Sequence, residues 1–377
     1  MSRDVDVLVV GAGIVGLAAA AALARRGLRV LVAERREAIA RETTSRSSEV
    51  VHAGLYYPEG SLKARLCVEG RERLYARCAE RGLPHRALGK LVVATEPEEL
   101  PRLEALARLG RANGAPGLEL LDAAEVRRRE PCVRALAALW SPRSGIVDAA
   151  ALALSYLAEA EAHGAALALR TDVEALEPAG GAWRVAARGA GGEPAALVAG
   201  WVVNAAGLAA DRVAALAGVD VAAAGYRQHP CKGDWFALAP GAPLRFAHLV
   251  YPLPAGAGLG VHVTLDLGGR VRLGPDAEYV AAPRYDVDPA KAQAFADAAG
   301  RYLPGLRAEW LAPDAAGVRP KLAGPGEGFR DFVVAEESAR GLPGLVDLVG
   351  IESPGLTAAP AIAERVADLV ARGERAD

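Results

Sequence analysis

Three glycines near the N-terminus are spaced for recognition of a dinucleotide. Gly11, Gly13 and Gly16 follow an apolar run, 5–10, and open a stretch rich in alanine and leucine. In such a pattern the first glycine permits a sharp turn, the second lets a pyrophosphate approach the backbone, and the third lets a helix pack closely on a sheet. The helix N-terminus then offers free N–H groups and partial positive charge to the pyrophosphate. The spacing predicts a strand, turn and helix that bind a dinucleotide.

Polar residues that could hold the rest of such a cofactor follow this unit. Glu34 ends a second apolar run, 28–33, where a carboxylate can bind ribose hydroxyls, and it argues against a ribose 2′-phosphate although Arg35 lies beside it. The next segment, 41–48, is rich in serine and threonine. Its hydroxyls and N–H groups could bind phosphate oxygens or a flavin edge, and a solvated loop is the alternative interpretation.

A second glycine-containing turn occurs near the C-terminus. It lies between an apolar run, 345–349, and a helical pattern, 358–372, and the strand pattern over 197–203 also ends in small residues. Two turns that each meet a helix N-terminus suit an extended cofactor with two polar ends, and FAD fits this better than NAD. The residues expected to contact the cofactor are Gly11, Gly13, Ile14, Val15, Gly16, Glu34, Arg35, Thr44, Ser45, Ser47, Ser48, Val173, Ala206, Gly207, Gly350, Ser353, Pro354, Gly355, Leu356 and Thr357.

Hydrophobic periodicity predicts the elements that must position these residues. Asp122 and Glu125 have the spacing of a helix capping box. Alternating apolar segments with prolines over 226–273 predict the antiparallel sheet of a second domain. Helical patterns cover 61–81, 97–113, 149–163 and 289–302, and strand patterns cover 89–95, 138–140, 145–148, 167–170, 183–187 and 197–203.

Composition narrows the class of protein. The 377 residues suffice for two domains, and a formal net charge of −2 with 52% hydrophobic residues does not suggest a nucleic-acid partner. The four cysteines show no Cys-x-x-Cys pair, so no metal site is expected. Charged residues precede the first strand, and no apolar run has the length of a membrane span. We therefore expect a soluble, cytoplasmic protein without a signal peptide or transmembrane segment, and peripheral contact with the inner membrane is left open.

Several motifs resemble those of a known family. The chain resembles the FAD-dependent oxidoreductases of the D-amino-acid oxidase superfamily, and within it the L-2-hydroxyglutarate dehydrogenases and oxidases, over nearly its whole length. The glycine turn is shared by many flavoproteins, whereas 52–57 (HAGLYY) followed by 61–67 (SLKARLC) is much more specific. The family often has glycine or another small residue at the position of Glu49, and arginine can replace Lys232, so this chain departs from the family pattern at these positions. The other matching segments are 89–91, 145–148, 206–208 with Asp211, 232–234, 273–275, 317–320 and 353–357.

The resemblance implies an α/β fold with two domains. One is a Rossmann-like FAD-binding domain of the glutathione-reductase and D-amino-acid-oxidase type, and the other is an α+β substrate domain built on an antiparallel sheet. The FAD-binding domain is expected to comprise 1–83, 148–221 and 319–377, and the substrate domain 84–147 and 222–318.

The resemblance also implies a reaction, which is hydride transfer from the alcohol carbon of a 2-hydroxy acid to flavin N5. L-2-Hydroxyglutarate would become 2-oxoglutarate, and the enzyme would need a base for the hydroxyl proton. Histidine has a pKa suited to this role. Among the six histidines, His52 lies beside the loop that the family wraps around the flavin, and His262 lies on a strand of the predicted substrate domain. His52 is the first candidate for this base and His262 is the second. The remaining alternative is that neither histidine acts as the base.

Cations are needed for the substrate carboxylates. Arg319 lies where the superfamily places an arginine near the flavin, and a guanidinium binds a carboxylate through two parallel hydrogen bonds; a surface arginine is the alternative. Lys232 and Lys321 are the predicted partners of a second carboxylate, and Tyr57 and Tyr251 of hydroxyl groups.

Two other functions keep the FAD and change the chemistry. One is a related oxidase or dehydrogenase acting on glycerol 3-phosphate or an amino acid, and the other is a flavin-binding protein without turnover. The electron acceptor is left open among dioxygen, a quinone and a carrier flavoprotein.

Overall fold

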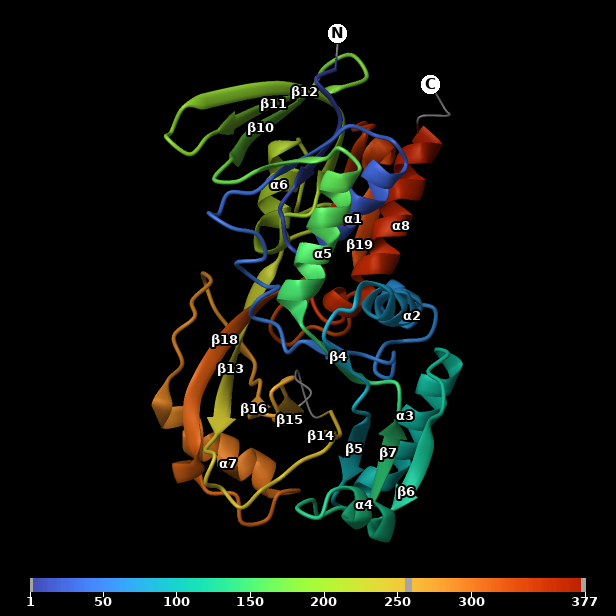
Figure 1. Ribbon diagram of the computed structural model, residues 1–377, viewed down its shortest axis with the longest axis vertical. Helices are drawn as coiled ribbons and strands as arrows, with labels where there is room; N and C mark the ends of the chain where they lie inside the picture. Colours follow the sequence, from blue (N-terminus) through green and yellow to red (C-terminus); the bar gives the residue numbers. More distant parts are fainter. Residues whose placement is uncertain (1–2, 255–259, 374–377) are drawn as a thin grey trace. The chain divides into compact units, whose positions relative to one another are not determined.

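The computed structural model describes residues 3–254 and 260–373 (Figure 1). Its contacts divide the chain into two discontinuous units. Unit 1 comprises Met1–Ser45, Ala149–His229 and Arg319–Asp377, and unit 2 comprises Arg46–Asp148 and Pro230–Val318. Each unit has a sheet and a hydrophobic core of its own.

The predicted domain boundaries differ from this division over 46–83 and 222–229, and at Asp148, which was predicted with the FAD-binding domain and belongs to unit 2. Residues 46–83 were predicted with the N-terminal segment, but they belong to unit 2, and 222–229 belong to unit 1. The first difference arises because β3 (Val50–Val51) pairs with β8 (Gly145–Val147), and because Leu55 packs in one core with Val92. These long-range contacts have no local signal in the sequence.

Unit 1 is built on an eight-stranded, mainly parallel sheet, in agreement with the predicted Rossmann-like fold. The strand order is β10-β11-β12-β1-β2-β9, with β20 beside β12 and β19 beside β20. Register aligns the carboxyl ends of the parallel strands at Ala33, Val10, Asn204 and Asp347. Its strands are β1 (Val5–Val10), β2 (Val30–Ala33), β9 (Ala166–Ala168), β10 (Asp172–Pro178), β11 (Trp183–Arg188), β12 (Pro194–Asn204), β19 (Val333–Glu336) and β20 (Leu345–Val349).

Helices cover this sheet. Helix α1 (Ile14–Arg25) packs against α5 (Ala149–Ala162) and α8 (Gly355–Gly373), and the three lie side by side in Figure 1. Their alanine-rich sequences allow close packing, and residues 16–24 of α1 are all buried. Helix α6 (Ala210–Leu216) packs instead with the side chains of Leu8 and Val10 on β1.

Unit 2 contains a nine-stranded sheet and a small three-stranded sheet. The large sheet has the order β17-β13-β16-β15-β14-β5-β7-β6, with β18 beside β13. The predicted antiparallel pairing over 226–273 is confirmed between β13 and β16, β15 and β16, and β14 and β15, while β14 pairs with β5 in parallel. The strands are β5 (Lys90–Ala94), β6 (Glu119–Asp122), β7 (Ala137–Ser141), β13 (His229–Leu238), β14 (Leu249–Pro252), β15 (His262–Leu265), β16 (Val271–Gly274), β17 (Glu278–Tyr279) and β18 (Leu311–Lys321), and β3 and β8 form the small sheet with β4 (His85–Arg86).

The helices of unit 2 follow local signals in the sequence. Ser61 caps α2, since its hydroxyl accepts a hydrogen bond from the Ala64 N–H. The capping box of Asp122 and Glu125 is present at the start of α4, as predicted. Glu49 has a left-handed backbone with φ of 59°, a conformation that favours glycine. The helices are α2 (Leu62–Arg81), α3 (Leu100–Ala112), α4 (Ala123–Arg129) and α7 (Ala292–Gly300), and the short 3₁₀ turns of the chain are Pro97–Glu99, Gly207–Ala209, Pro289–Lys291, Ala308–Trp310 and Glu337–Arg340.

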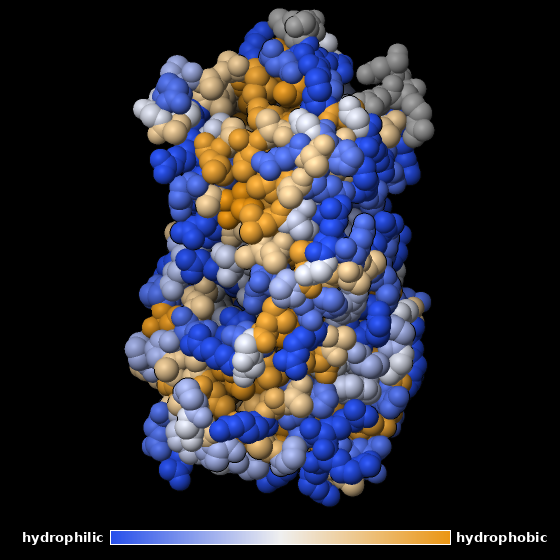
Figure 2. Space-filling view, viewed as in Figure 1, coloured by the Kyte–Doolittle hydropathy of each residue, from blue (hydrophilic) through white to orange (hydrophobic). Residues whose placement is uncertain are grey.

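Hydrophobic residues reach the surface of unit 1 on the face shown in Figure 2, over an area bordered by hydrophilic residues. Among large apolar side chains of unit 1, Leu154 is 56% exposed and Phe329 is 48% exposed. None of the described helices has the length and apolar character needed to cross a membrane.

Candidate active site

The glycine turn after β1 has two glycines that the chain itself requires and one that it does not. A Cβ on Gly11 would lie 2.6 Å from the carbonyl oxygen of Ala205, and one on Gly16 would lie 2.0 Å from the carbonyl oxygen of Gly11. On Gly13 the nearest atom, the Thr44 hydroxyl oxygen, would be 3.4 Å away, and Gly13 has an ordinary φ of −75°. An added Cβ on Gly13 would therefore make only an ordinary contact, so the chain itself does not require glycine here, whereas the close approach of a pyrophosphate does.

Side chains predicted to bind the cofactor also hold this turn in place. The Thr44 hydroxyl accepts a hydrogen bond from the Ile14 N–H at 3.1 Å, at the start of α1. One carboxylate oxygen of Glu34 accepts from the Ala12 N–H at 2.8 Å. Arg35 forms an ion pair with Glu42 at 2.7 Å, so its charge is already matched. Glu34 and Thr44 thus fix the backbone that is expected to meet the cofactor.

The ends of β12 and β20 are joined by a residue that the sequence did not single out. The Gln228 side chain donates to the Gly207 carbonyl at 3.0 Å and accepts from the Gly350 N–H at 2.9 Å. Its side chain is buried, so these two turns are held together within unit 1. Only the position of Gln228 between distant strands reveals this role, since no motif surrounds it.

A buried polar pair supports the same edge of the sheet. The Asn204 side chain donates to a carboxylate oxygen of Asp347 at 2.7 Å, which links the last residue of β12 to β20. Burial raises the pKa of Asp347 to about 7. Ligands of open parallel sheets bind at the carboxyl ends of the strands, where these groups lie.

The remaining predicted cofactor residues lie in three places. Gly355, Leu356 and Thr357 form the first turn of α8, which begins three residues before the predicted start, and Ser353 and Pro354 precede it. Val173 is buried in the core of unit 1. Ser47 and Ser48 belong to unit 2, whereas Ser45 belongs to unit 1. The turn at Gly13, the N-terminus of α1 and the two further small-residue turns of unit 1 fit the phosphate groups of a dinucleotide such as FAD.

Unit 2 brings the two candidate histidines into one buried group. The rings of His262 and Tyr251 are stacked with centroids 3.5 Å apart and planes within 9°. The Lys90 ammonium lies 4.0 Å from the Tyr251 ring centroid and 5.5 Å from that of Tyr56. His52, Lys90, Tyr251 and His262 are all buried.

Strand register explains why these residues meet. Tyr251 and His262 lie on neighbouring strands of the large sheet, and Lys90 pairs in register with Leu249. Because side chains alternate between the two faces of a strand, every second residue of each strand lies on the same face of the sheet. Leu91, Val250 and Val263 lie in the hydrophobic core on one face, so Lys90, Tyr251 and His262 share the other face. We call this second face the polar face.

The electrostatics of the group favour an uncharged imidazole. Burial holds the pKa of His52 well below its usual value, and the neighbouring positive charges of Lys90 and His262 lower it further. Burial also lowers the pKa of Lys90 to about 7. A neutral imidazole at pH 7 can accept a proton, as a general base must.

The remaining predicted substrate residues lie in different parts of the structure. Tyr57 packs beside Ala64 and Cys67 in a separate small cluster, away from the Tyr251 cluster. The Lys232 ammonium forms a fully buried ion pair with Asp234 at 2.5 Å. Arg319 and Lys321 are half-buried near the end of β18, in unit 1. The role of each in substrate binding stays a prediction.

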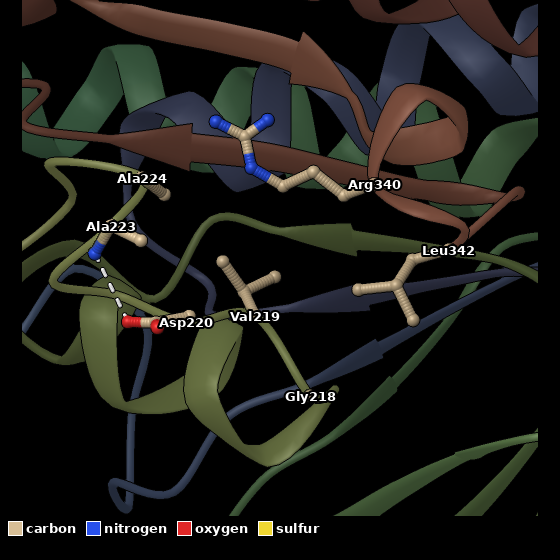
Figure 3. A pocket seen from close by; sticks show the side chains of 7 residues that line it. All are labelled: Gly218, Val219, Asp220, Ala223, Ala224, Arg340 and Leu342. Atoms are coloured by element: carbon tan, nitrogen blue, oxygen red, sulfur yellow. Dashed lines mark hydrogen bonds between the residues drawn. The ribbon is translucent and has the colours of Figure 1, made fainter.

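A pocket in unit 1 involves none of the predicted residues (Figure 3). It has a volume of about 390 Å³ and is lined by Gly218, Val219, Asp220, Ala223, Ala224, Arg340 and Leu342. The Asp220 carboxylate accepts from the Ala223 N–H at 3.0 Å, and Arg340 forms an ion pair with Glu337 at 3.4 Å. Its charged groups are therefore engaged in the fold itself.

Comparison with known proteins decides the family. Residues 6–369 match the family of FAD dependent oxidoreductases, also called DAO. The chain belongs to this family. Its sequence is 40% identical over 97% of the chain to an L-2-hydroxyglutarate dehydrogenase, mitochondrial, of Arabidopsis thaliana, and the match covers 83% of that protein. The relative of the same name from Homo sapiens is 36% identical, over 72% of this chain and 60% of that protein. The resemblance found in the sequence is confirmed.

Solved structures agree with this FAD-dependent oxidoreductase in fold. An L-alpha-glycerophosphate oxidase from Mycoplasma pneumoniae with FAD bound has a TM-score of 0.86 and 25% identity, and the match covers 97% of this chain and 94% of that one. A glycine oxidase from Geobacillus kaustophilus has a TM-score of 0.81 and 24% identity, over 98% and 95% of the two chains. The predicted fold and the predicted FAD are thereby confirmed.

Replacing Lys90 of this oxidoreductase by methionine should stabilise the fold. The unfolded chain keeps the lysine proton up to a pH near the ordinary pKa of 10.5, whereas the folded chain loses it above about pH 7. Burying the Lys90 ammonium therefore lowers the free energy of unfolding. This loss is complete below pH 7 and disappears as the pH rises to 10.5. We expect Lys90→Met to raise the free energy of unfolding by ~3 kcal/mol at pH 6 and by little at pH 10.

Urea unfolding of both proteins across this pH range measures the difference. Lys232→Met is the matched control, because it removes an ammonium that is buried but paired with Asp234. Its loss removes one of the two ammonium partners that the described residues give the buried Asp234 carboxylate, which keeps only Lys291 at 2.8 Å, and should destabilise the fold. Equal effects of the two substitutions, or a gain for Lys90→Met that grows with pH, would show that Lys90 is not held as an unfavourable buried cation.

Proposed function

We propose that this protein oxidises L-2-hydroxyglutarate to 2-oxoglutarate. The observation that carries the proposal is the 40% identity, over 97% of the chain, to the Arabidopsis thaliana protein named L-2-hydroxyglutarate dehydrogenase. The buried histidines of unit 2 supply the base that such a reaction needs. FAD is the cofactor of the family.

The groups that would hold FAD lie in unit 1. The turn at Gly13 and the first amides of α1 would bind the pyrophosphate, and Glu34 the ribose. The turns at Gly207 and Gly355 would contact the rest of the cofactor. Bound FAD would supply the acceptor for the hydride that leaves the alcohol carbon.

The proposed base is His52. Its depressed pKa keeps the imidazole neutral over the physiological range, so it can take the hydroxyl proton as the C–H bond breaks. His262 is the alternative base, and its ring is held by the stack with Tyr251. Burial of both excludes water from the proton transfer.

Arg319 is the proposed ligand of the substrate carboxylate beside the reacting carbon. Arg319→Lys keeps the charge but loses the planar fork, so the substrate would be attracted and poorly aimed. We expect flavin reduction by L-2-hydroxyglutarate to slow by ~10²-fold with unchanged FAD content. Stopped-flow reduction measures the rate, and Arg184→Lys on the surface of unit 1 is the control. A parental rate for Arg319→Lys would remove Arg319 from the site.

Turnover with a panel of substrates tests the proposed function. Purified holoenzyme is assayed with L-2-hydroxyglutarate, D-2-hydroxyglutarate, glycerol 3-phosphate and glycine, using an artificial dye as acceptor. We expect a kcat/KM for L-2-hydroxyglutarate that exceeds the other three by at least ~10²-fold. A preference for glycerol 3-phosphate or glycine would instead assign an activity like that named for the structural neighbours. Reoxidation by dioxygen, a quinone or a carrier flavoprotein then separates the three acceptors. The cytoplasmic location stays a prediction.

A further inference from the structure

The polar face of unit 2 carries an arginine whose binding edge is not used by the part of the chain that the structure describes. Arg272 lies on β16 opposite Thr264 of β15, so it shares the face of His262 and Tyr251. Its Nε and Nη2 atoms are buried and have no hydrogen-bond partner among residues 3–254 and 260–373. The side chain is 14% exposed, which places it at the accessible side of the group.

The other contacts of Arg272 fix the direction of this edge. The Nη1 atom lies 4.0 Å from a carboxylate oxygen of Asp314, and the guanidinium carbon lies 5.4 Å from the centroid of the Trp235 ring. The Nη1 atom thus faces Asp314, whereas Nε and Nη2 are left without a hydrogen-bond partner among the described residues. These two atoms form the edge of a guanidinium that binds both oxygens of one carboxylate in parallel hydrogen bonds. Leaving such donors buried and unsatisfied is unfavourable, so a ligand that accepts from them is expected.

The surroundings favour an anion. On the polar face, strands β5, β14, β15 and β16, all fully described, present Lys90, Tyr251, His262, Thr264 and Arg272 among apolar side chains, and none of these residues is a carboxylate. Lys90 also lacks a hydrogen-bond partner within the described residues. The face is therefore rich in hydrogen-bond donors, and the Arg272 guanidinium adds positive charge, as a carboxylate site requires.

We propose that Arg272 binds the carboxylate of the substrate that is remote from the reacting carbon, through Nε and Nη2. The inference rests on the proposed function, which supplies a dicarboxylate, and it moves this role away from Lys232. The Lys232 ammonium is paired with Asp234. By strand alternation Lys232 lies on the same side of β13 as Phe236, which belongs to the core on the opposite face.

The test compares ligands that differ only in the remote carboxylate. Holoenzyme is titrated with glutarate and with pentanoate by calorimetry, and its flavin is reduced with L-2-hydroxyglutarate and with L-2-hydroxypentanoate. Arg272→Met should weaken glutarate binding and lower kcat/KM for L-2-hydroxyglutarate by ~10²-fold, with less than ~3-fold change for the monocarboxylates. Arg272→Lys keeps charge without the fork and should lie between the parent and Arg272→Met.

Arg270→Met is the matched control. Arg270 lies two residues away and pairs with the same Asp314 at 2.6 Å, but its side chain is 54% exposed. It should leave the selectivity between dicarboxylate and monocarboxylate at the parental value. FAD content and circular dichroism confirm that each variant is folded.

Three outcomes decide the matter. Selective loss of the dicarboxylates in Arg272→Met supports the site. Equal weakening of both ligands, or a shift equal to that of Arg270→Met, overturns it while L-2-hydroxyglutarate remains the substrate of the parent. If the parent oxidises another substrate and not L-2-hydroxyglutarate, the proposed function fails. The Arg272 site is then judged by glutarate binding alone, and it is refuted if Arg272→Met binds glutarate as tightly as the parent.

Discussion

Replacing Gly13 by valine should give a folded protein that no longer retains FAD. Gly13 has an ordinary backbone conformation, and an added Cβ meets nothing closer than the Thr44 hydroxyl at 3.4 Å. We therefore expect the fold to tolerate valine at this position. The branched side chain would, however, occupy the space through which the pyrophosphate approaches. We expect FAD occupancy after purification to fall by at least ~10-fold, with the unfolding temperature of the FAD-free protein within a few degrees of that of the parent apoprotein.

Two controls separate cofactor binding from folding. Gly241→Val makes the same change where an added Cβ meets no atom within 4 Å, and it should retain FAD. Gly16→Val places its side chain against the Gly11 carbonyl and should destabilise the apoprotein itself. Full FAD occupancy in Gly13→Val would show that the turn does not bind the pyrophosphate.

Replacing His52 by alanine should keep FAD bound and slow its reduction by L-2-hydroxyglutarate by ~10²–10⁴-fold, the range for loss of a general base. The depressed pKa also sets the pH dependence of the parent. Because the base must be neutral, the rate should fall only at a pH below 6.5, the ordinary pKa of histidine, as the imidazole gains a proton. Anaerobic stopped-flow reduction between pH 5 and pH 9 measures both effects.

His85→Ala is the control for this experiment, since His85 is half-buried and its ring contacts the Leu83 carbonyl at 2.8 Å. It should reduce at the parental rate. If His52→Ala also reduces at that rate while His262→Ala is slow, the base is His262. If both variants keep the parental rate and pH profile, neither histidine is the base.

Features that depend on short stretches of chain were predictable from the sequence. The turn at Gly11, Gly13 and Gly16 and the capping box at Asp122 follow from the steric and hydrogen-bonding needs of neighbouring residues. Strands β10 and β19 were not predicted. On β10, exposed Glu174 and Glu177 interrupt the apolar pattern that indicates a strand.

Features that depend on register between distant strands were not predictable. Lys90 and Arg272 meet the Tyr251 and His262 stack only because β5, β14, β15 and β16 are neighbours in one sheet. Gln228 acquires its role in the same way, from turns that are remote in sequence. Periodicity gives the face on which a residue lies along its own strand, but it does not identify the neighbouring strand.

Charge alone does not show whether a cation is available to a ligand. Lys232 was predicted to bind a substrate carboxylate and Arg35 to contact the cofactor, and the structure pairs them with Asp234 and Glu42. A sequence shows that a charge is present, whereas its availability to a ligand depends on which carboxylate the fold brings to it. Arg272 gave no signal in the sequence for the same reason, although its Nε and Nη2 atoms have no hydrogen-bond partner among the described residues.

Anaerobic titration of the purified holoenzyme with L-2-hydroxyglutarate tests the central claim most directly. One equivalent of substrate per FAD should bleach the oxidised flavin spectrum completely and yield one equivalent of 2-oxoglutarate, whereas D-2-hydroxyglutarate should leave the spectrum unchanged. A flavin that stays oxidised with excess L-2-hydroxyglutarate, or one that is bleached without formation of 2-oxoglutarate, would contradict the proposed function.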